Sequence, residues 1–264
     1  MNIVVCIKQV PETTEVKINP ETNTLIREGV KSIINPFDMY AIEEGVRLKE
    51  KLGGSTIVIT MGPPQAEAAL REAISIGMDE GILISDRNFA GSDTWATSYT
   101  LAQAIKKISQ ARGRIDLVIC GKQASDGDTA QVGPGISVHL DIPQVTFVKK
   151  IEEINEKRAR VERMTEEGYE IIETPLPVLF TVVKEINEPR LPSLKGMMRA
   201  KSAKITNWTA KDIEADAGSI GLSGSPTNVV KIFTPPPRTG GQILEGDALE
   251  VARKIVELLK NEIT

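Results

Sequence analysis

The strongest constraint on the fold is that short apolar runs alternate with amphipathic stretches through the first half of the chain. The apolar runs cover residues 3–7, 57–59, 82–84 and 117–119, have the length of strands and contain no alternating polar residues. Such runs are typical of parallel strands that are buried on both faces. The stretches between them carry apolar residues every three or four positions, as helices do. This order predicts an α/β fold with a doubly wound, mostly parallel sheet and helices on both of its faces.

The second half of the chain has a different pattern. Short β segments are expected at residues 145–148, 169–172 and 178–183, and they add strands to the sheet. Glycine and proline are frequent in residues 209–246, which is typical of an extended arm. Asp247 then provides a cap for a closing amphipathic helix. We therefore expect an α/β domain over residues 1–208 and an arm ending in a helix over residues 209–264.

Composition excludes several classes of function. The chain has two cysteines, Cys6 and Cys120, and one histidine, His139, so we expect neither a metal site nor a catalytic residue set. A net charge of -4 argues against nucleic acid as a partner. No apolar run is long enough to span a membrane, and Met1 leads straight into a strand pattern without a basic leader. These features predict a cytoplasmic protein that does not insert into a membrane.

The densest functional pattern directly follows the strand at residues 117–119. It runs from Gly121 to Pro134 and leads into a helical stretch that ends near Leu140. In open α/β sheets, nucleotides bind where a strand end passes into a helix, because free backbone N–H groups face a phosphate there. Glycines at positions 121 and 127 would let the chain approach a ligand closely. The other strand ends, and residues 35–38 at a helix start, should lie beside this loop.

A purely structural interpretation also fits this segment. Asp128 and Gln131 have the spacing of a helix capping box, and Asn35 is a preferred N-cap residue. However, Pro134 conflicts with a helix that begins at residue 128, because proline lacks the N–H that the helix interior needs. The segment contains no G-x-G-x-x-G or Walker motif, so it belongs to neither of the standard nucleotide-binding loops.

Several motifs together resemble one known family. They are V-C-I-K-Q-V-P at 5–11, N-P-F-D at 35–38, T-M-G-P-P at 60–64 and G-K-Q-A-S-D-G-D-T-A-Q-V-G-P at 121–134, with a further signature-like stretch at 161–181. In these motifs, and over essentially its whole length, the chain resembles the β subunit of electron-transfer flavoprotein. The resemblance implies an adenine-nucleotide α-hydrolase-like sheet.

The resemblance also implies a function. Members of this family pair with an α subunit that carries an electron-transferring FAD, while the β subunit holds a second nucleotide. The small residues of the loop favour FAD over AMP at that second site. This implies an electron-bifurcating subunit, which with its α subunit takes electrons from NADH to an acyl-CoA-type dehydrogenase and to ferredoxin or flavodoxin. Oxidoreductase activity is then expected only in the complex. Two alternatives remain open: a simple electron carrier that holds structural AMP, and an adenine-nucleotide-binding stress or signalling module.

Positions that match the family define the candidate site residues. The implied cofactor contacts are Cys6, Asn35, Pro36, Phe37, Asp38, Met61, Gly121, Lys122, Gln123, Ala124, Ser125, Asp126, Gly127, Asp128, Thr129, Ala130, Gln131 and Val132. Residues 187–201 match the recognition loop that docks on the partner dehydrogenase, and the implied contacts are Leu191, Leu194, Lys195, Met197 and Met198. Leu194 stands where the family inserts a leucine into that dehydrogenase. The arm and helix after residue 208 are expected to pack on the α subunit.

Overall fold

The computed structural model describes residues 1–12, 17–18, 25–26, 32–231, 241 and 243–263. The chain divides into two compact units. The larger one takes in Met1–Lys17 and Leu25–Val230, and the smaller one contains the C-terminal helix. The two units are described separately.

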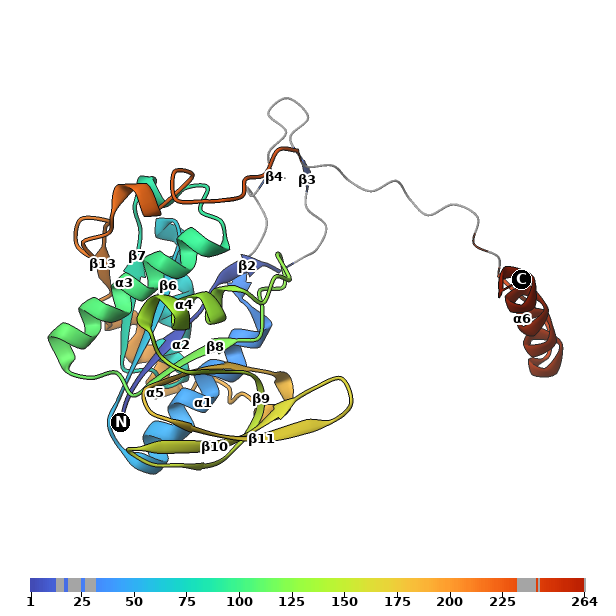
Figure 1. Ribbon diagram of the computed structural model, residues 1–264, viewed down its shortest axis with the longest axis horizontal. Coiled ribbons are helices and arrows are strands. Elements are labelled where there is room, and N and C mark those ends of the chain that lie inside the picture. Colours follow the sequence, from blue (N-terminus) through green and yellow to red (C-terminus); the bar gives the residue numbers. More distant parts are fainter. Residues whose placement is uncertain (13–16, 19–24, 27–31, 232–240, 242, 264) are drawn as a thin grey trace. The chain divides into compact units, whose positions relative to one another are not determined.

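The larger unit is built around a nine-stranded sheet with the order β11-β10-β9-β12-β8-β1-β6-β7-β13 (Figure 1). The strands are β1 (Asn2–Cys6), β6 (Ser55–Met61), β7 (Glu80–Ile84), β8 (Leu117–Gly121), β9 (Gln144–Ile154), β10 (Arg158–Met164), β11 (Tyr169–Pro175), β12 (Val178–Val182) and β13 (Thr206–Trp208). Pairing is parallel from β9 through β12 to β13 and antiparallel along β9, β10 and β11. The predicted mostly parallel sheet with added β segments is confirmed.

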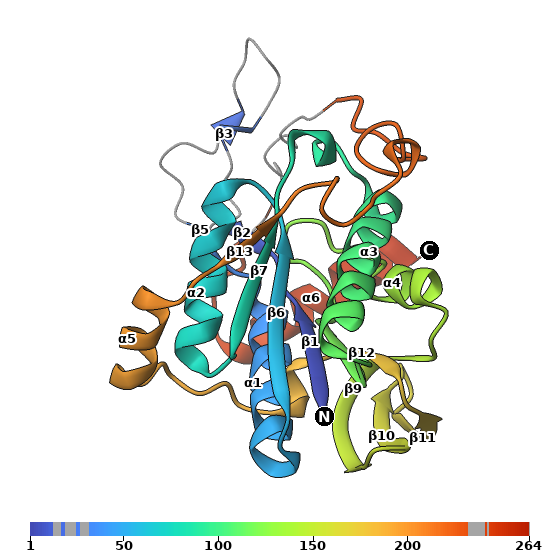
Figure 2. The ribbon, with the colours of Figure 1, turned by 90° about the vertical axis from the view of Figure 1, so that its left-hand side faces the viewer.

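Helices cover both faces of this sheet, as Figure 2 shows. The helices are α1 (Pro36–Leu52), α2 (Glu67–Ile76), α3 (Thr94–Arg112), α4 (Val132–Leu140) and α5 (Leu194–Ser202), with short 3-10 turns at Pro64–Ala66, Arg87–Phe89, Lys184–Ile186 and Ala217–Ser219. On one face, Ile3 and Val5 of β1 join a core with α1 and α2. On the other face, Val4 and Cys6 join a core with α3 and α4. The alternation along β1 therefore explains the doubly wound arrangement.

The added β segments extend the sheet at one side. β12 is buried along its whole length and lies between β8 and β9, which fits its unbroken apolar run. Residues 165–168 join β10 to β11, and the Thr165 N–H donates to the Gly168 carbonyl over 3.0 Å. Two further small pairs lie outside the main sheet: β2 (Gln9–Pro11) with β5 (Ser32–Ile34), and β3 (Lys17–Ile18) with β4 (Leu25–Ile26).

Residues 209–230 differ from the expected arm. Ala210, Ile213 and Ile220 are buried in the core that contains α3, so this stretch packs on the larger unit. Its glycine content is typical of an extended arm. The three buried apolar residues are nevertheless enough to anchor this irregular segment on the larger unit. The larger unit accordingly extends to Val230.

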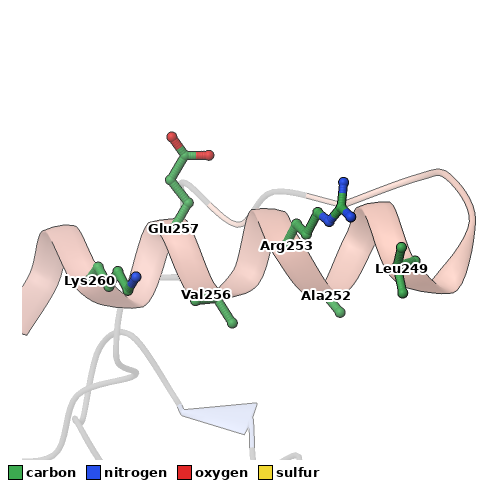
Figure 3. A pocket seen from close by; sticks show the side chains of 6 residues that line it. All are labelled: Leu249, Ala252, Arg253, Val256, Glu257 and Lys260. Atoms are coloured by element: carbon green, nitrogen blue, oxygen red, sulfur yellow. The ribbon is translucent and has the colours of Figure 1, made fainter.

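The smaller unit is described mainly by helix α6 (Ala248–Ile263). The predicted cap is present, since the Asp247 carboxylate accepts hydrogen bonds from the N–H groups of Leu249 and Glu250. Apolar side chains on α6, including Leu249 and Val256, are more than half exposed and line a shallow hollow along the helix (Figure 3). Packing of α6 on an α subunit stays a prediction. Among the described residues, no helix is both long and apolar enough to cross a membrane.

Candidate nucleotide site and docking helix

The carboxyl ends of three neighbouring strands bring the predicted site residues together. β1 lies between β6 and β8, and Cys6 is the register partner of both Ile59 and Cys120. Cys6, Met61 and Gly121 therefore end adjacent strands at one edge of the sheet. Helix α1 begins beside them. Its first turn lies so close to Gly121 that a side chain at this position would collide with the backbone of Phe37. This is the edge of a parallel sheet at which ligands bind.

The loop between β8 and α4, residues 122–131, has no regular secondary structure. Two residues in it that are not glycine, Asp128 and Ala130, have positive φ angles of 51° and 54°. Left-handed backbone at such residues costs free energy and is concentrated at functional sites. Consecutive residues of this loop can therefore direct their amides in ways that a helix does not allow.

Helix α4 begins at Val132 rather than at residue 128, so the capping-box interpretation of the loop is wrong. Gln131 occupies the N-cap position and its side chain makes no capping hydrogen bond. Pro134 is the third helical residue, where its missing N–H costs nothing. The conflict noted in the sequence is thus resolved by a later start. The first-turn amides of Val132 and Gly133 have no partner within the helix and receive no side-chain cap.

Asn35 ties the loop to the start of α1. It stands at the N-cap position, but its side chain does not cap the helix. Instead, its Nδ2 donates to the Gln123 carbonyl over 2.8 Å, and its Oδ1 accepts from the Ser125 N–H over 3.0 Å. The interpretation of Asn35 as a simple cap is therefore wrong. This asparagine shapes the loop.

Each of the two loop carboxylates has a partner. Asp126 forms an ion pair with Lys8 over 2.7 Å, and Asp128 accepts from the Gln123 side chain over 2.7 Å. At the end of the loop, Thr94 donates its hydroxyl hydrogen to Gln131 Oε1 over 2.8 Å. Because the negative charges are engaged within the protein, they oppose an incoming phosphate less than free carboxylates would.

Asp38 joins α1 to the ends of β1 and β8. Its carboxylate is 5% exposed and accepts from the Lys8 N–H over 2.7 Å and from the Gly121 N–H. Burial raises the pKa of Asp38 to about 7, although hydrogen bonds from Asn35, Lys8 and Gly121 act in the opposite direction. A buried titratable group thus holds the two central strand ends together.

This raised pKa predicts a pH dependence of stability. Between the ordinary value of 3.8 and about 7, the folded protein retains a proton that the unfolded chain releases. The free energy of unfolding should therefore fall as pH rises through this window and level off above it, by a few kcal/mol in all. In Asp38→Asn this contribution should be absent. Urea unfolding of both proteins from pH 4.5 to pH 8 measures the difference, and parallel curves for the two proteins would contradict it.

Phe147 belongs to this region and was missed by the sequence reasoning. It lies on β9 with a φ of 59°, and its N–H donates to Thr181 Oγ1 over 3.0 Å. The Lys122 ammonium lies 5.3 Å from the centre of its ring and 5.9 Å from that of Phe37, within the range of cation–π attraction. A single phenylalanine within a predicted strand does not indicate in the sequence that its ring will contact Lys122.

The residues for which the sequence predicts docking lie on or beside a helix that the sequence pattern did not predict. The resemblance predicts a loop over residues 187–201, yet α5 begins at Leu194 and its N-cap Ser193 accepts from the Gly196 N–H over 3.0 Å. Arg199 fixes α5 to the body by donating to the carbonyls of Ile74 and Met78. A helix of nine residues is marginal by itself, so these tertiary contacts decide its formation.

The outer side of this segment is apolar and exposed. Leu191 is 88% exposed and Leu194 73%, and Met197, Met198 and Lys195 are also exposed. The segment before α5 is held by Arg190, whose guanidinium forms ion pairs with Glu43 over 2.9 Å and with Glu50 over 2.6 Å. Exposed leucines on a firmly anchored support are typical of an interaction surface.

These features define the class of protein: a doubly wound α/β protein with an irregular loop and an uncapped helix start at the carboxyl edge of its sheet, and with a separate exposed apolar surface. The profile of the electron transfer flavoprotein domain matches residues 22–213. The chain is 53% identical over 262 residues to an electron transfer flavoprotein subunit beta of Thermoanaerobacterium thermosaccharolyticum, covering 99% of this chain and 98% of that protein. The chain belongs to the electron transfer flavoprotein β-subunit family.

Other relatives carry more specific names. The caffeyl-CoA reductase-Etf complex subunit CarD of Acetobacterium woodii is 50% identical over 264 residues and 99% of each chain is covered. Protein FixA of Azotobacter vinelandii is 48% identical over 242 residues, covering 90% of this chain and 86% of that protein. The family assignment makes this chain an electron-transfer subunit that works with an α subunit. It also rules out the stress or signalling module that the sequence left open.

Proposed function

We propose that this β subunit binds FAD at the carboxyl ends of β1, β6 and β8 and works in electron bifurcation. With its α subunit it would take electrons from NADH and divide them between an acyl-CoA-type dehydrogenase and ferredoxin or flavodoxin. The observation that carries the nucleotide part is the uncapped start of α4 behind an open loop. Free amides and the positive end of a helix dipole attract phosphate oxygens.

The residues present fit a dinucleotide. The amides of Val132 and Gly133 have no partner within the helix and would face a diphosphate bound at its start, and the loop carboxylates are paired with Lys8 and Gln123. A Cβ at Gly127 would meet no atom within 4 Å, so the middle of the loop is open. Asn35 and Asp38 would hold the loop and strand ends in place, while the bound flavin itself supplies the redox chemistry.

One relative supports the partner class. Acetobacterium woodii CarD is named as a subunit of a caffeyl-CoA reductase complex, which links a similar chain to a CoA-thioester reductase. For this chain, we place the corresponding contact on residues 187–201, where Leu191, Leu194, Met197 and Met198 project from the body and Lys195 adds a positive charge. An apolar anchor with charged neighbours gives specific binding through a small area.

A cofactor count tests the FAD proposal directly. The chain should be purified with its α subunit, and flavin and AMP should be measured after acid release. We expect two flavins and no AMP per heterodimer. Anaerobic addition of NADH should bleach the flavin absorption at about 450 nm. One flavin and one AMP per heterodimer would instead identify a simple electron carrier. Absence of both at the β site would remove the nucleotide proposal.

A further inference from the structure

The two cysteines of this chain lie side by side beneath the candidate nucleotide site. Cys6 on β1 and Cys120 on β8 are register partners in adjacent parallel strands. Both belong to the core on the α3 and α4 face, with exposed fractions of 7% and 6%. Since register partners in parallel strands point to the same face, the two thiols share one buried position at the end of the sheet. The sequence separation of these cysteines gave no indication of this.

The two thiols are in contact with each other. A hydrogen bond with Cys6, followed by burial and the nearby Asp38 carboxylate, raises the pKa of the Cys120 thiol. Cys120 therefore does not react as an exposed thiolate would. Two adjacent thiols can nevertheless lose their protons to a metal ion that binds sulfur strongly.

The spacing accommodates a bridging ion. Neighbouring strands lie about 4.8 Å apart, which is also compatible with a disulfide, so the experiment below includes disulfide formation as a separate outcome. Two metal–sulfur bonds of about 2.3 Å in line span a distance close to the strand spacing. Zinc requires four ligands. Among the described residues, no group of three or more His, Cys, Asp or Glu is placed to hold a metal ion. A two-coordinate soft ion fits better, because thiolates select such ions.

The start of α4 offsets the charge of such a complex. A Cβ at Gly133 would lie 3.6 Å from Cys120 Cβ, so the first turn of α4 packs directly against this cysteine. The N-cap Gln131 leaves the first-turn amides without a side-chain partner. One monovalent ion with two thiolates carries a single negative charge, and the positive end of a helix stabilises a negative charge placed there.

We propose that Cys6 and Cys120 form a binding site for one soft, two-coordinate ion, Cu⁺ or Ag⁺, held between two thiolates at the floor of the candidate nucleotide site. Binding forms two metal–sulfur bonds and releases two protons, with no change in oxidation state. The site does not depend on the identity of the nucleotide. Metal ions that prefer sulfur ligands would therefore bind this subunit at one defined position.

The test uses the full chain under anaerobic conditions with both thiols reduced. Cu⁺ is supplied from a chromophoric bidentate chelator, and the number of ions transferred is read from the chelator absorbance. Native mass spectrometry and a pH-stat give the mass and the protons released. We expect one ion bound per chain and two protons released per ion, with loss of the ion in Cys6→Ala and in Cys120→Ala.

Met61→Leu is the matched control, because Met61 packs against the same core and carries another sulfur atom. It should still bind one ion. Loss of the ion in this variant would overturn the two-thiolate assignment, as would retention of the ion in Cys6→Ala/Cys120→Ala. The proposal is also overturned if the wild-type chain retains no ion in competition with the chelator. It is likewise overturned if the wild-type chain loses two hydrogens by forming a disulfide and takes up no metal. If an alanine variant does not fold, the proton count and mass of the wild-type chain decide.

Discussion

Gly121→Ala is expected to destabilise the protein by about 3 kcal/mol or more and to abolish nucleotide retention. A Cβ at this position would collide with Asp38 Oδ1 and would lie 2.7 Å from the Phe37 carbonyl carbon. The backbone of α1 cannot yield without breaking the hydrogen bond from the Lys8 N–H to Asp38. The substitution therefore separates the helix start from the strand ends. Urea unfolding and the flavin and AMP content of the purified heterodimer measure both effects.

Gly127→Ala provides the matched control in the same loop. Nothing lies within 4 Å of a Cβ there, and its backbone is not in the left-handed region. We expect stability within about 0.5 kcal/mol of the wild type and normal nucleotide content. Equal loss in both variants would show that the loop tolerates no side chain at all, which would contradict the specific contact with Asp38. These neighbouring glycines therefore have different roles. The sequence predicts that both glycines admit a ligand, and the structure adds a packing reason for glycine at Gly121, where a Cβ would collide with Asp38 and Phe37.

Leu194→Ala is expected to lower kcat/KM for the partner dehydrogenase by about 30-fold. The leucine is 73% exposed at the first residue of α5, where it is free to enter a pocket of another protein. NADH oxidation with an artificial acceptor should be unchanged, because Leu194 lies apart from the carboxyl ends of β1, β6 and β8. Steady-state assays of the heterodimer with each acceptor separate the two activities. Equal loss of both would remove the docking assignment.

Leu222→Ala serves as its control. Leu222 is 64% exposed but lies beside Gly91, outside α5. We expect electron delivery to the dehydrogenase at the wild-type rate. A similar decrease in this variant would show that exposed leucines in general, rather than Leu194, affect the reaction.

Much of the fold could be predicted because the burial of a strand or helix follows from the pattern of apolar residues in its own sequence. The unbroken apolar runs at β1, β6, β7 and β8 predicted parallel strands, and the structure confirms them. The position of the loop at a strand end followed from the same reasoning. These features depend on neighbours in sequence.

The role of single side chains could not be predicted in the same way. Asn35 has the identity and position of a helix cap, but its side chain bonds to a loop 88 residues away. α5 has no clear helical pattern and forms because Gly196 allows it to approach Ser75 and because Arg199 binds carbonyls of the body. Ile213 and Ile220 are buried by α3, although their surroundings in sequence are typical of an arm.

The sequence by itself determined the alternation of strands and helices in the first half of the chain, the edge at which the loop emerges and, through its motifs, the family. Only the tertiary structure decided that Asp38 joins two strands to a helix, that Phe147 flanks Lys122 and that Cys6 meets Cys120. The physical reason is that periodicity reports whether a residue is buried, whereas hydrogen bonds, ring contacts and thiol pairs depend on which distant residue is buried beside it.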